Sequence, residues 1–274
     1  MNKLYVSTGA IVGKANSYDH RVIIENFEKF PCDGFEIMLL GFWYKNLDKI
    51  AAELNAAGIK MPVVHFDKDI GVIFSENDER FVPRALDFFK QNVEFADEIG
   101  ADKAVFHLWG GPKSDGNIDV TIDLLPQMEE ECKKHGVKLL IENIPCVYSD
   151  PLSVWGKIAE KQPDAEFIFD TRFGAFHGQY LDIFASPLWK KVKHMHISSY
   201  SGVAAQWGLI RPILHPGEGT VDFDHIFSNI PHYEESITIE SPVLRDDGTL
   251  DVDKMLGTIG YMRKIIEKYR PYEK

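Results

Sequence analysis

Short apolar segments alternate with longer segments of helical periodicity along most of the chain. Eight runs rich in Val, Ile, Leu and Phe predict β-strands at residues 4–7, 34–39, 62–66, 104–108, 138–143, 166–170, 192–197 and 236–240. The segments that follow these runs repeat apolar residues at intervals of three and four. This spacing predicts helices at residues 19–29, 47–57, 81–99, 118–135, 151–160, 179–186, 222–228 and 251–269.

The alternation of strands and helices predicts the fold class α/β, with a single (β/α)8 TIM barrel over residues 1–274. Two strand-to-strand intervals are long, and their extra residues, 67–79 and 199–221, directly follow strands. We expect these segments to be loops at the end of the barrel that carries active sites, where they can close over a substrate. A doubly wound open sheet is disfavoured, because no glycine-rich phosphate-binding motif follows the first strand.

Seven of the predicted strands end near an ionisable residue that follows buried apolar positions. Burial of such a side chain is costly unless it is paired or bound to a metal. In a barrel these strand ends converge on one mouth, where imidazoles and carboxylates together fit a divalent metal. The residues concerned are Glu36, His65, His107, Glu142, Asp170, His196 and Glu240.

Each of these residues also has a simpler interpretation. A single histidine at a strand end is more often hydrogen-bonded than a ligand, and a glutamate there is often part of a salt bridge. His65 and His107 can complete a second metal site, bind a substrate hydroxyl or orient a carboxylate, and Glu36 is the weakest candidate. The recurrence of the pattern favours a metal site for one set of residues, Glu142, Asp170, His196 and Glu240.

For other residues near the strand ends, a structural role is considered beside a functional one. We expect His194 to face the opposite side of its strand from His196, toward the helices. Several aromatic residues can form an apolar wall for one face of a substrate, or can cap the barrel core. They are Phe42, Trp43, Phe66, Trp109 and Trp207.

Composition narrows the class of protein. The chain has 30 Lys and Arg residues against 42 Asp and Glu residues, a formal charge of −12, which disfavours nucleic acid as a partner without excluding it. No apolar run reaches the roughly 18–20 residues that span a bilayer, and the first residues do not form a convincing signal peptide. The three cysteines, Cys32, Cys132 and Cys146, are widely spaced and predict free thiols. We therefore expect a cytoplasmic protein that does not bind membranes.

The motifs LIENIP, IFDTR, HMHIS and TIESP, at the ends of the last four strands, resemble the xylose isomerase-like TIM-barrel superfamily. This group includes isomerases and epimerases of sugars and sugar phosphates, and the endonuclease IV type of abasic-site nuclease (AP endonuclease family 2). In the epimerase branch the resemblance implies one divalent ion, with two glutamates that also move protons as catalytic residues. Its ligands would be Glu142, Asp170, His196 and Glu240, and the proton carriers Glu142 and Glu240. In the nuclease branch it implies that His65 and His107 join a multinuclear zinc site.

The sequence also departs from this family. The usual Asp-x-x-His after the sixth strand is here Asp170-Thr171-Arg172-Phe173, and the nuclease pattern Asp-x-His before the last strand is absent. A complete three-zinc site is therefore disfavoured. Arg172 can occupy the mouth and bind a phosphate or carboxylate of the substrate, or it can form a surface ion pair.

The leading hypothesis is a divalent-metal-dependent isomerase or epimerase of a small sugar or sugar phosphate. It would act through a metal-stabilised enediolate with glutamate acid and base groups. The metal would be Mn, Co, Mg or Zn. The alternatives are a zinc phosphodiesterase acting on abasic DNA and a non-catalytic carbohydrate-binding barrel. His65, His107, Arg172, Glu36 and Trp109 are candidates for a second metal or for substrate binding, and a homo-oligomer is among the possible assemblies.

Overall fold

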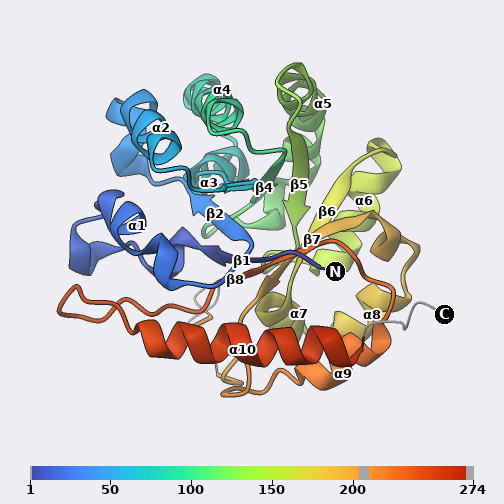
Figure 1. The fold of residues 1–274 in the computed structure, drawn as a ribbon. Coiled ribbons are helices and arrows are strands. Elements are labelled where there is room, and N and C mark those ends of the chain that lie inside the picture. Colours follow the sequence, from blue (N-terminus) through green and yellow to red (C-terminus); the bar gives the residue numbers. More distant parts are fainter. Residues whose placement is uncertain (1, 204–209, 270–274) are drawn as a thin grey trace.

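The computed structural model describes residues 2–203 and 210–269, and these form a closed barrel of parallel strands surrounded by helices (Figure 1). The strands pair in chain order, and β8 closes the barrel on β1. The predicted (β/α)8 TIM barrel and all eight of its predicted strands are confirmed. Their bounds are β1 Leu4–Ser7, β2 Gly34–Met38, β3 Val63–His65, β4 Lys103–Phe106, β5 Lys138–Glu142, β6 Glu166–Asp170, β7 Val192–Ile197 and β8 Ser236–Ile239.

Ten α-helices lie in the described part of the chain. They are α1 Arg21–Asn26, α2 Leu47–Ala56, α3 Asp69–Glu76, α4 Val82–Glu98, α5 Ile118–Lys134, α6 Pro151–Lys161, α7 Thr171–His177, α8 Tyr180–Ala185, α9 Phe223–Asn229 and α10 Val252–Lys268. Eight correspond to predicted helices, whereas α3 and α7 lie in segments where the pattern predicts none. The expectation of an open loop at residues 67–79 is wrong, because α3 occupies most of it and buries Ile70 and Phe74.

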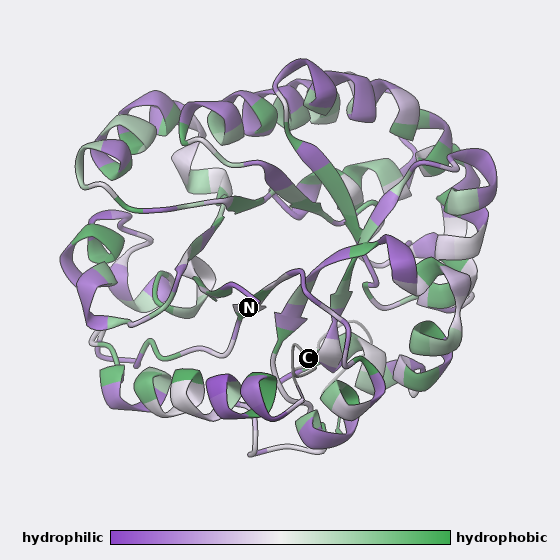
Figure 2. Ribbon diagram, turned by 45° about the vertical axis from the view of Figure 1, so that its right-hand side comes forward, coloured by the Kyte–Doolittle hydropathy of each residue, from purple (hydrophilic) through white to green (hydrophobic). Residues whose placement is uncertain are grey.

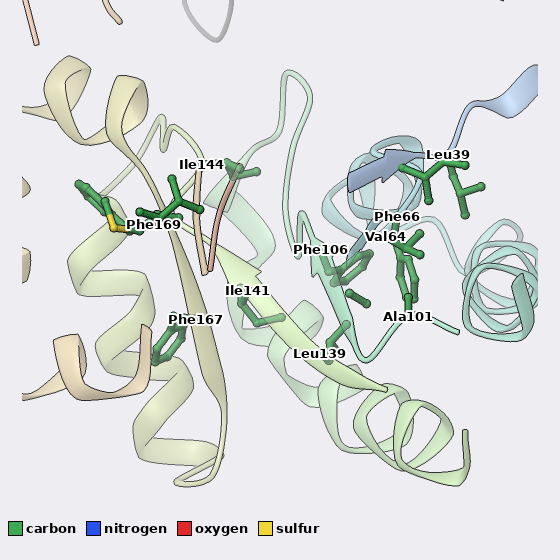
Figure 3. Packing of buried hydrophobic residues seen from close by; sticks show 14 of the residues in the cluster. Leu39, Val64, Phe66, Ala101, Phe106, Leu139, Ile141, Ile144, Phe167 and Phe169 are labelled. Atoms are coloured by element: carbon green, nitrogen blue, oxygen red, sulfur yellow. The ribbon is translucent and has the colours of Figure 1, made fainter. Parts of the chain in front are cut away.

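Side chains along each strand alternate between the barrel interior and the surrounding helices. Val64, Phe106, Ile141 and Phe169 belong to the large apolar cluster that packs strands against helices (Figure 3). The residues directly before them face the other way and form a small separate cluster inside the barrel. That interior layer consists of Tyr5, Val63, Val105, Leu140 and Ile168.

The next inward position on the same strands is polar. His65, Glu142 and Asp170 each lie two residues after a member of the interior apolar layer, so the period of two turns them inward above it. All three are buried. The barrel therefore has an apolar layer beneath a polar one, and the polar layer lies at the mouth, the end of the barrel at which the strands finish.

The helices carry hydrophilic and hydrophobic residues in alternating bands (Figure 2). Their apolar positions pack on the strands, as in α4, where Phe89, Val93 and Ala96 are buried at intervals of three and four. Within the described residues, no helix combines the length and the apolar character that a membrane span requires.

Candidate metal centre

Five residues that the sequence pattern places at strand ends converge on the barrel mouth. Glu142 ends β5, Asp170 ends β6, His65 ends β3 and His196 is the second-last residue of β7. Glu240 directly follows β8, and its amide nitrogen donates a hydrogen bond to the Ile197 carbonyl oxygen of β7 at 3.0 Å. Five different strands thus supply the candidate set.

Glu142 lies at the centre of this group. Its Oε1 lies 2.8 Å from His196 Nδ1, and its Oε2 lies 2.5 Å from His107 Nε2 and 3.6 Å from His65 Nε2. Glu240 Oε1 lies 3.3 Å from the same Nδ1 of His196. One carboxylate therefore bridges three imidazoles, and a second approaches from β8.

The same residues supply atoms at spacings that suit a metal ion. Glu142, Asp170 and His196 can offer one ligand atom each within 4.8 Å of one another. Three overlapping sets meet the same limit, namely His65 with His107 and Glu142, His65 with His196 and Glu240, and Glu36 with His194 and His196. Nitrogen and oxygen ligands in this mixture suit zinc, manganese, cobalt or magnesium to different degrees.

Several of these atoms are buried but make no hydrogen bond. They are Oε2 of Glu142, Oδ2 of Asp170, and Nε2 of both His65 and His107. The contact between His107 and Glu142 is short, but it lacks hydrogen-bond geometry. Buried polar atoms without a hydrogen bond are rare because they are costly, so four of them in the barrel mouth fit a bound cation.

The tautomer of His65 supports the same interpretation. Its Nδ1 lies 2.8 Å from the carbonyl oxygen of Phe66, which can only accept, so Nδ1 carries the hydrogen. Nε2 is then left with a lone pair directed at Glu142. A histidine whose second nitrogen donates to a backbone carbonyl is the usual arrangement of a metal ligand.

Electrostatics in the mouth couple these groups. Burial favours the neutral form of Glu142, but the neighbouring imidazoles of His196 and His107 outweigh it and hold the pKa of Glu142 well below its usual range. Burial also opposes charge on His196, yet the carboxylates of Glu240, Glu36 and Glu142 raise its pKa well above the usual value. Burial lowers the pKa of His107 to about 4, with Glu142 acting in the opposite direction. Without a metal, the proton between His196 and Glu142 offsets part of the negative charge of the surrounding carboxylates.

Asp170 has a divided role. Its Oδ1 accepts a hydrogen bond from the Phe173 amide at 2.7 Å and so caps α7, while its Oδ2 faces the mouth. Burial raises the pKa of Asp170, and the charges of Glu240 and Glu142 add to this, whereas Arg172 opposes it. The carboxylate is thus costly to ionise unless a cation lies beside it.

Arg172 is buried next to Asp170, so the alternative of a surface ion pair is wrong. Its Nε donates to Ser198 Oγ at 3.2 Å and its Nη1 to the Ile210 carbonyl oxygen at 3.1 Å. Nη2 lies 3.8 Å from Asp170 Oδ2. The guanidinium thus holds a fixed position beside the candidate centre.

Glu36 and His194 lie deeper than the sequence analysis places them. Glu36 is the third residue of β2, so it points inward one layer below the mouth, where it contacts His196 Nε2 at 2.9 Å. The expectation that His194 faces the helices is wrong. Residues two apart on a strand share a face, and His194 Nε2 lies 3.0 Å from Glu36 Oε2 inside the barrel.

The aromatic residues near the strand ends have mixed positions. Trp109 is fully buried, and its indole nitrogen donates to the Pro145 carbonyl oxygen at 3.3 Å, which favours a packing role. Trp43 and Phe66 are also buried, whereas Phe42 is 72% exposed and stacks on Tyr18. Trp207 lies outside the described residues.

A family model described as xylose isomerase-like TIM barrel matches residues 24–259. The chain belongs to this family. The match spans the strands from β2 to β8 and therefore every candidate residue of the mouth. No curated protein sequence matches the chain.

Solved structures similar to this member of the xylose isomerase-like family include sugar epimerases. A D-tagatose 3-epimerase-like protein has a TM-score of 0.73 and 18% identity, over 97% of this chain and 98% of that one. D-allulose 3-epimerase from Methylomonas sp., in complex with D-allulose, has a TM-score of 0.72 and 14% identity, over 96% of each chain. The IOLI protein with a bound zinc atom has a TM-score of 0.72 and 16% identity, over 97% of this chain and 99% of that one. At these identities the likeness shows the shared fold.

Sequence reasoning missed the polar residues beneath the mouth. Ser236 and Thr238 of β8 and Lys103 of β4 form hydrogen bonds around His194 and Glu36. The inward alternation of Ser236, Thr238 and Glu240 along β8 was the available signal, because every second residue of an interior-facing series shares one side.

Proposed function

We propose that the chain is a divalent-metal-dependent isomerase or epimerase of a small sugar or sugar phosphate. The observation that carries the proposal is the convergence of buried, unpartnered nitrogen and oxygen atoms on the barrel mouth. The sugar epimerases among the similar folds support it. We assign Glu142, Asp170, His196 and Glu240 as the residues that hold the ion.

A bound divalent ion would supply Lewis acidity, which polarises a substrate carbonyl and eases proton loss from the neighbouring carbon. The chain's own carboxylates would move that proton. Glu240, whose side chain is 9% exposed against 1% for Glu142, lies nearer the opening. The low pKa of Glu142 keeps it ionised. Its Oε2 makes no hydrogen bond, so this oxygen is the one open to a proton. We assign the two glutamates to opposite faces of the reacting carbon, which is the arrangement that inverts a stereocentre.

The remaining polar residues would position the substrate. His65 and His107 both turn Nε2 toward Glu142, where an imidazole can bind a sugar hydroxyl or hold the carboxylate in place. Arg172 would contact an anionic substituent, because a buried guanidinium favours phosphate or carboxylate oxygens. The KM for a phosphorylated sugar is compared with the KM for the free sugar. If the wild type favours the phosphorylated sugar and Arg172→Lys does not, Arg172 selects a phosphorylated substrate.

The test is exchange of substrate hydrogen with solvent. Metal-loaded protein is incubated in D2O with a panel of ketopentoses, ketohexoses and their phosphates, and deuterium at the carbons next to the carbonyl is followed by NMR. We expect incorporation with at least one sugar, and a loss of about 100-fold or more in Glu142→Gln and Glu240→Gln. A folded, metal-loaded Glu142→Gln with full turnover would contradict the assignment.

Abasic-site nuclease activity is the second candidate, favoured by the set His65, His107 and Glu142. That set lies beside Asp170 and His196 and has the nitrogen-rich character of a zinc site. The excess of acidic residues opposes it, because binding of a duplex needs clustered cations. Nicking of an abasic duplex by zinc-loaded protein, lost in His107→Ala, would establish this activity in place of the first.

A further inference from the structure

A buried chain of hydrogen bonds runs from the mouth down through the barrel interior. It begins at His196, passes through Glu36 and His194, and ends at Ser236 and Lys103 near the opposite end of the barrel. Glu36, His194 and His196 have no measurable exposure. Isosteric apolar residues would fill this space without the cost of burying a carboxylate, so the chain calls for an explanation.

The donors and acceptors of this chain fix its direction. The Lys103 ammonium has three hydrogens and three acceptors, namely the Lys193 carbonyl oxygen at 3.0 Å and, at 3.3 Å each, Glu235 Oε2 and Ser236 Oγ. His194 Nε2 lies 3.0 Å from Glu36 Oε2, which only accepts, so Nε2 carries the ring hydrogen. Nδ1 of the neutral ring therefore accepts the hydrogen of Ser236 Oγ, 2.7 Å away.

The same logic continues to the mouth. Thr238 Oγ1 donates to Glu36 Oε2 at 2.8 Å, since a carboxylate only accepts, and His194 Nε2 donates to both of these oxygens. Glu36 is thereby held by two donors from below. Its oxygens lie 2.9 and 3.1 Å from His196 Nε2, which must donate to them.

We propose that Glu36 is a positioning residue that makes Nδ1 the metal-binding nitrogen of His196. With the Nε2 hydrogen committed to Glu36, Nδ1 is the nitrogen that can give up its proton and bind an ion. It faces Glu142 and Glu240, which are ligands of the metal site proposed above, on which this inference rests. The carboxylate also increases the basicity of the imidazole, as partners outside the ligand set of a metal do. Glu36 is held in place by hydrogen bonds from His194 and Thr238. His194 is in turn held by Ser236, which Lys103 contacts.

The test compares metal affinity in Glu36→Gln with that in the wild type. Zinc affinity is measured by competition with a chelator, and the visible spectrum of the cobalt-loaded protein reports the ligand geometry. We expect Glu36→Gln to lose about 10-fold to 100-fold in affinity and to change the cobalt spectrum. Val105→Ala, in the apolar layer of the same interior, is the matched control: it should unfold at a lower temperature with affinity within about twofold of wild type.

A second measurement needs no variant. Nitrogen-15 NMR of the histidine rings in zinc-loaded wild type should show His196 bound through Nδ1 with its hydrogen on Nε2. Coordination through Nε2 would overturn the inference, as would a Glu36→Gln protein of unchanged affinity and spectrum. These results would leave the proposed function standing. A wild-type protein that takes up no divalent metal would overturn both.

Discussion

Glu142 presents its two carboxylate oxygens to different imidazoles. Oε1 faces His196, while Oε2 faces His65 and His107 and makes no hydrogen bond. Such a carboxylate can bind an ion through one oxygen and take up a proton on the other. The oxygen of Glu142 that makes no hydrogen bond is thus the atom that an ion or a proton would occupy in the proposed reaction.

Metal binding should depend on pH in a defined direction. His196 has a raised pKa and Asp170 a raised pKa, so both hold protons that a metal must displace. The stability that His196 gains from its raised pKa is lost as the pH rises from 6.5 toward the pKa of the folded protein. Asp170 destabilises the folded state as the pH rises above 3.8, the ordinary pKa of an aspartate, because its pKa in the folded protein is higher. The metal-free protein should thus weaken at alkaline pH while the metal binds more tightly.

The measurement is the metal-induced rise in Tm at two pH values, with chelated protein as the control at each. The rise should be larger at about pH 8 than at about pH 5.5. An equal or smaller rise at the higher pH would show that His196 and Asp170 do not lose protons to the ion.

Individual residues also show how much of the candidate site could be predicted from the sequence. Glu142, Asp170, His196 and Glu240 were predicted together because each follows a clear apolar strand. The depth of Glu36 could not be read in the same way, because β2 continues for two residues past it. His194 was misplaced by a wrong application of the strand period, not by a missing signal. The hydrogen-bonding roles of Ser236 and Lys103 depend on strand register across the barrel, which a single sequence does not display.

At the scale of elements, the short helices set the geometry of the mouth. The segment Thr171–His177 forms α7, and its N-cap is Asp170, a candidate ligand. The cap fixes Oδ1 on the helix and leaves Oδ2 for the mouth. No helix is predicted here because α7 begins at the residue that follows the end of β6, so no loop separates the two elements in the sequence pattern.

Variants of Asp170 should separate its two roles. Asn is as good an N-cap as Asp, so Asp170→Asn keeps the cap and removes the cost of ionising a buried carboxyl. We expect metal-free Asp170→Asn to unfold at or above the wild-type temperature at about pH 8, with metal affinity lost. Asp170→Ala should in addition lose about 1 kcal/mol of stability with the cap. Thermal unfolding measures the stability of both variants. An Asp170→Asn protein as unstable as Asp170→Ala would argue against this division of roles.

Helix α3 packs tightly against the end of β4. A Cβ at Gly71 would overlap the carbonyl oxygen of His107, so only glycine allows this approach. We expect Gly71→Ala to cost roughly 1–3 kcal/mol of unfolding free energy and to disturb His107. Gly156→Ala in α6, where a Cβ meets nothing within 4 Å, should instead stabilise by about 0.5–1 kcal/mol. Urea unfolding checks both, and a neutral Gly71→Ala would show that α3 is free to move.

At the scale of the whole molecule, closure of the barrel brings together residues more than a hundred positions apart. β8 pairs with β1, and this closes the circle on which His65, His196 and Glu240 meet. The order of strands and helices was predictable because each element has its own period. Residues 199–221 are expected to form a loop. Their described part, 199–203 and 210–221, carries no helix and no strand beyond an isolated bridge between Ser199 and Leu214.

The number of metal ions bound per chain decides between a single-metal centre and a multinuclear one. The protein is stripped with a chelator, reloaded with zinc or manganese, freed of excess metal and analysed for metal and protein content. We expect one tightly bound divalent ion per chain in the wild type and none in Asp170→Asn. No bound ion, or two to three zinc ions per chain, would contradict a single-metal sugar isomerase or epimerase.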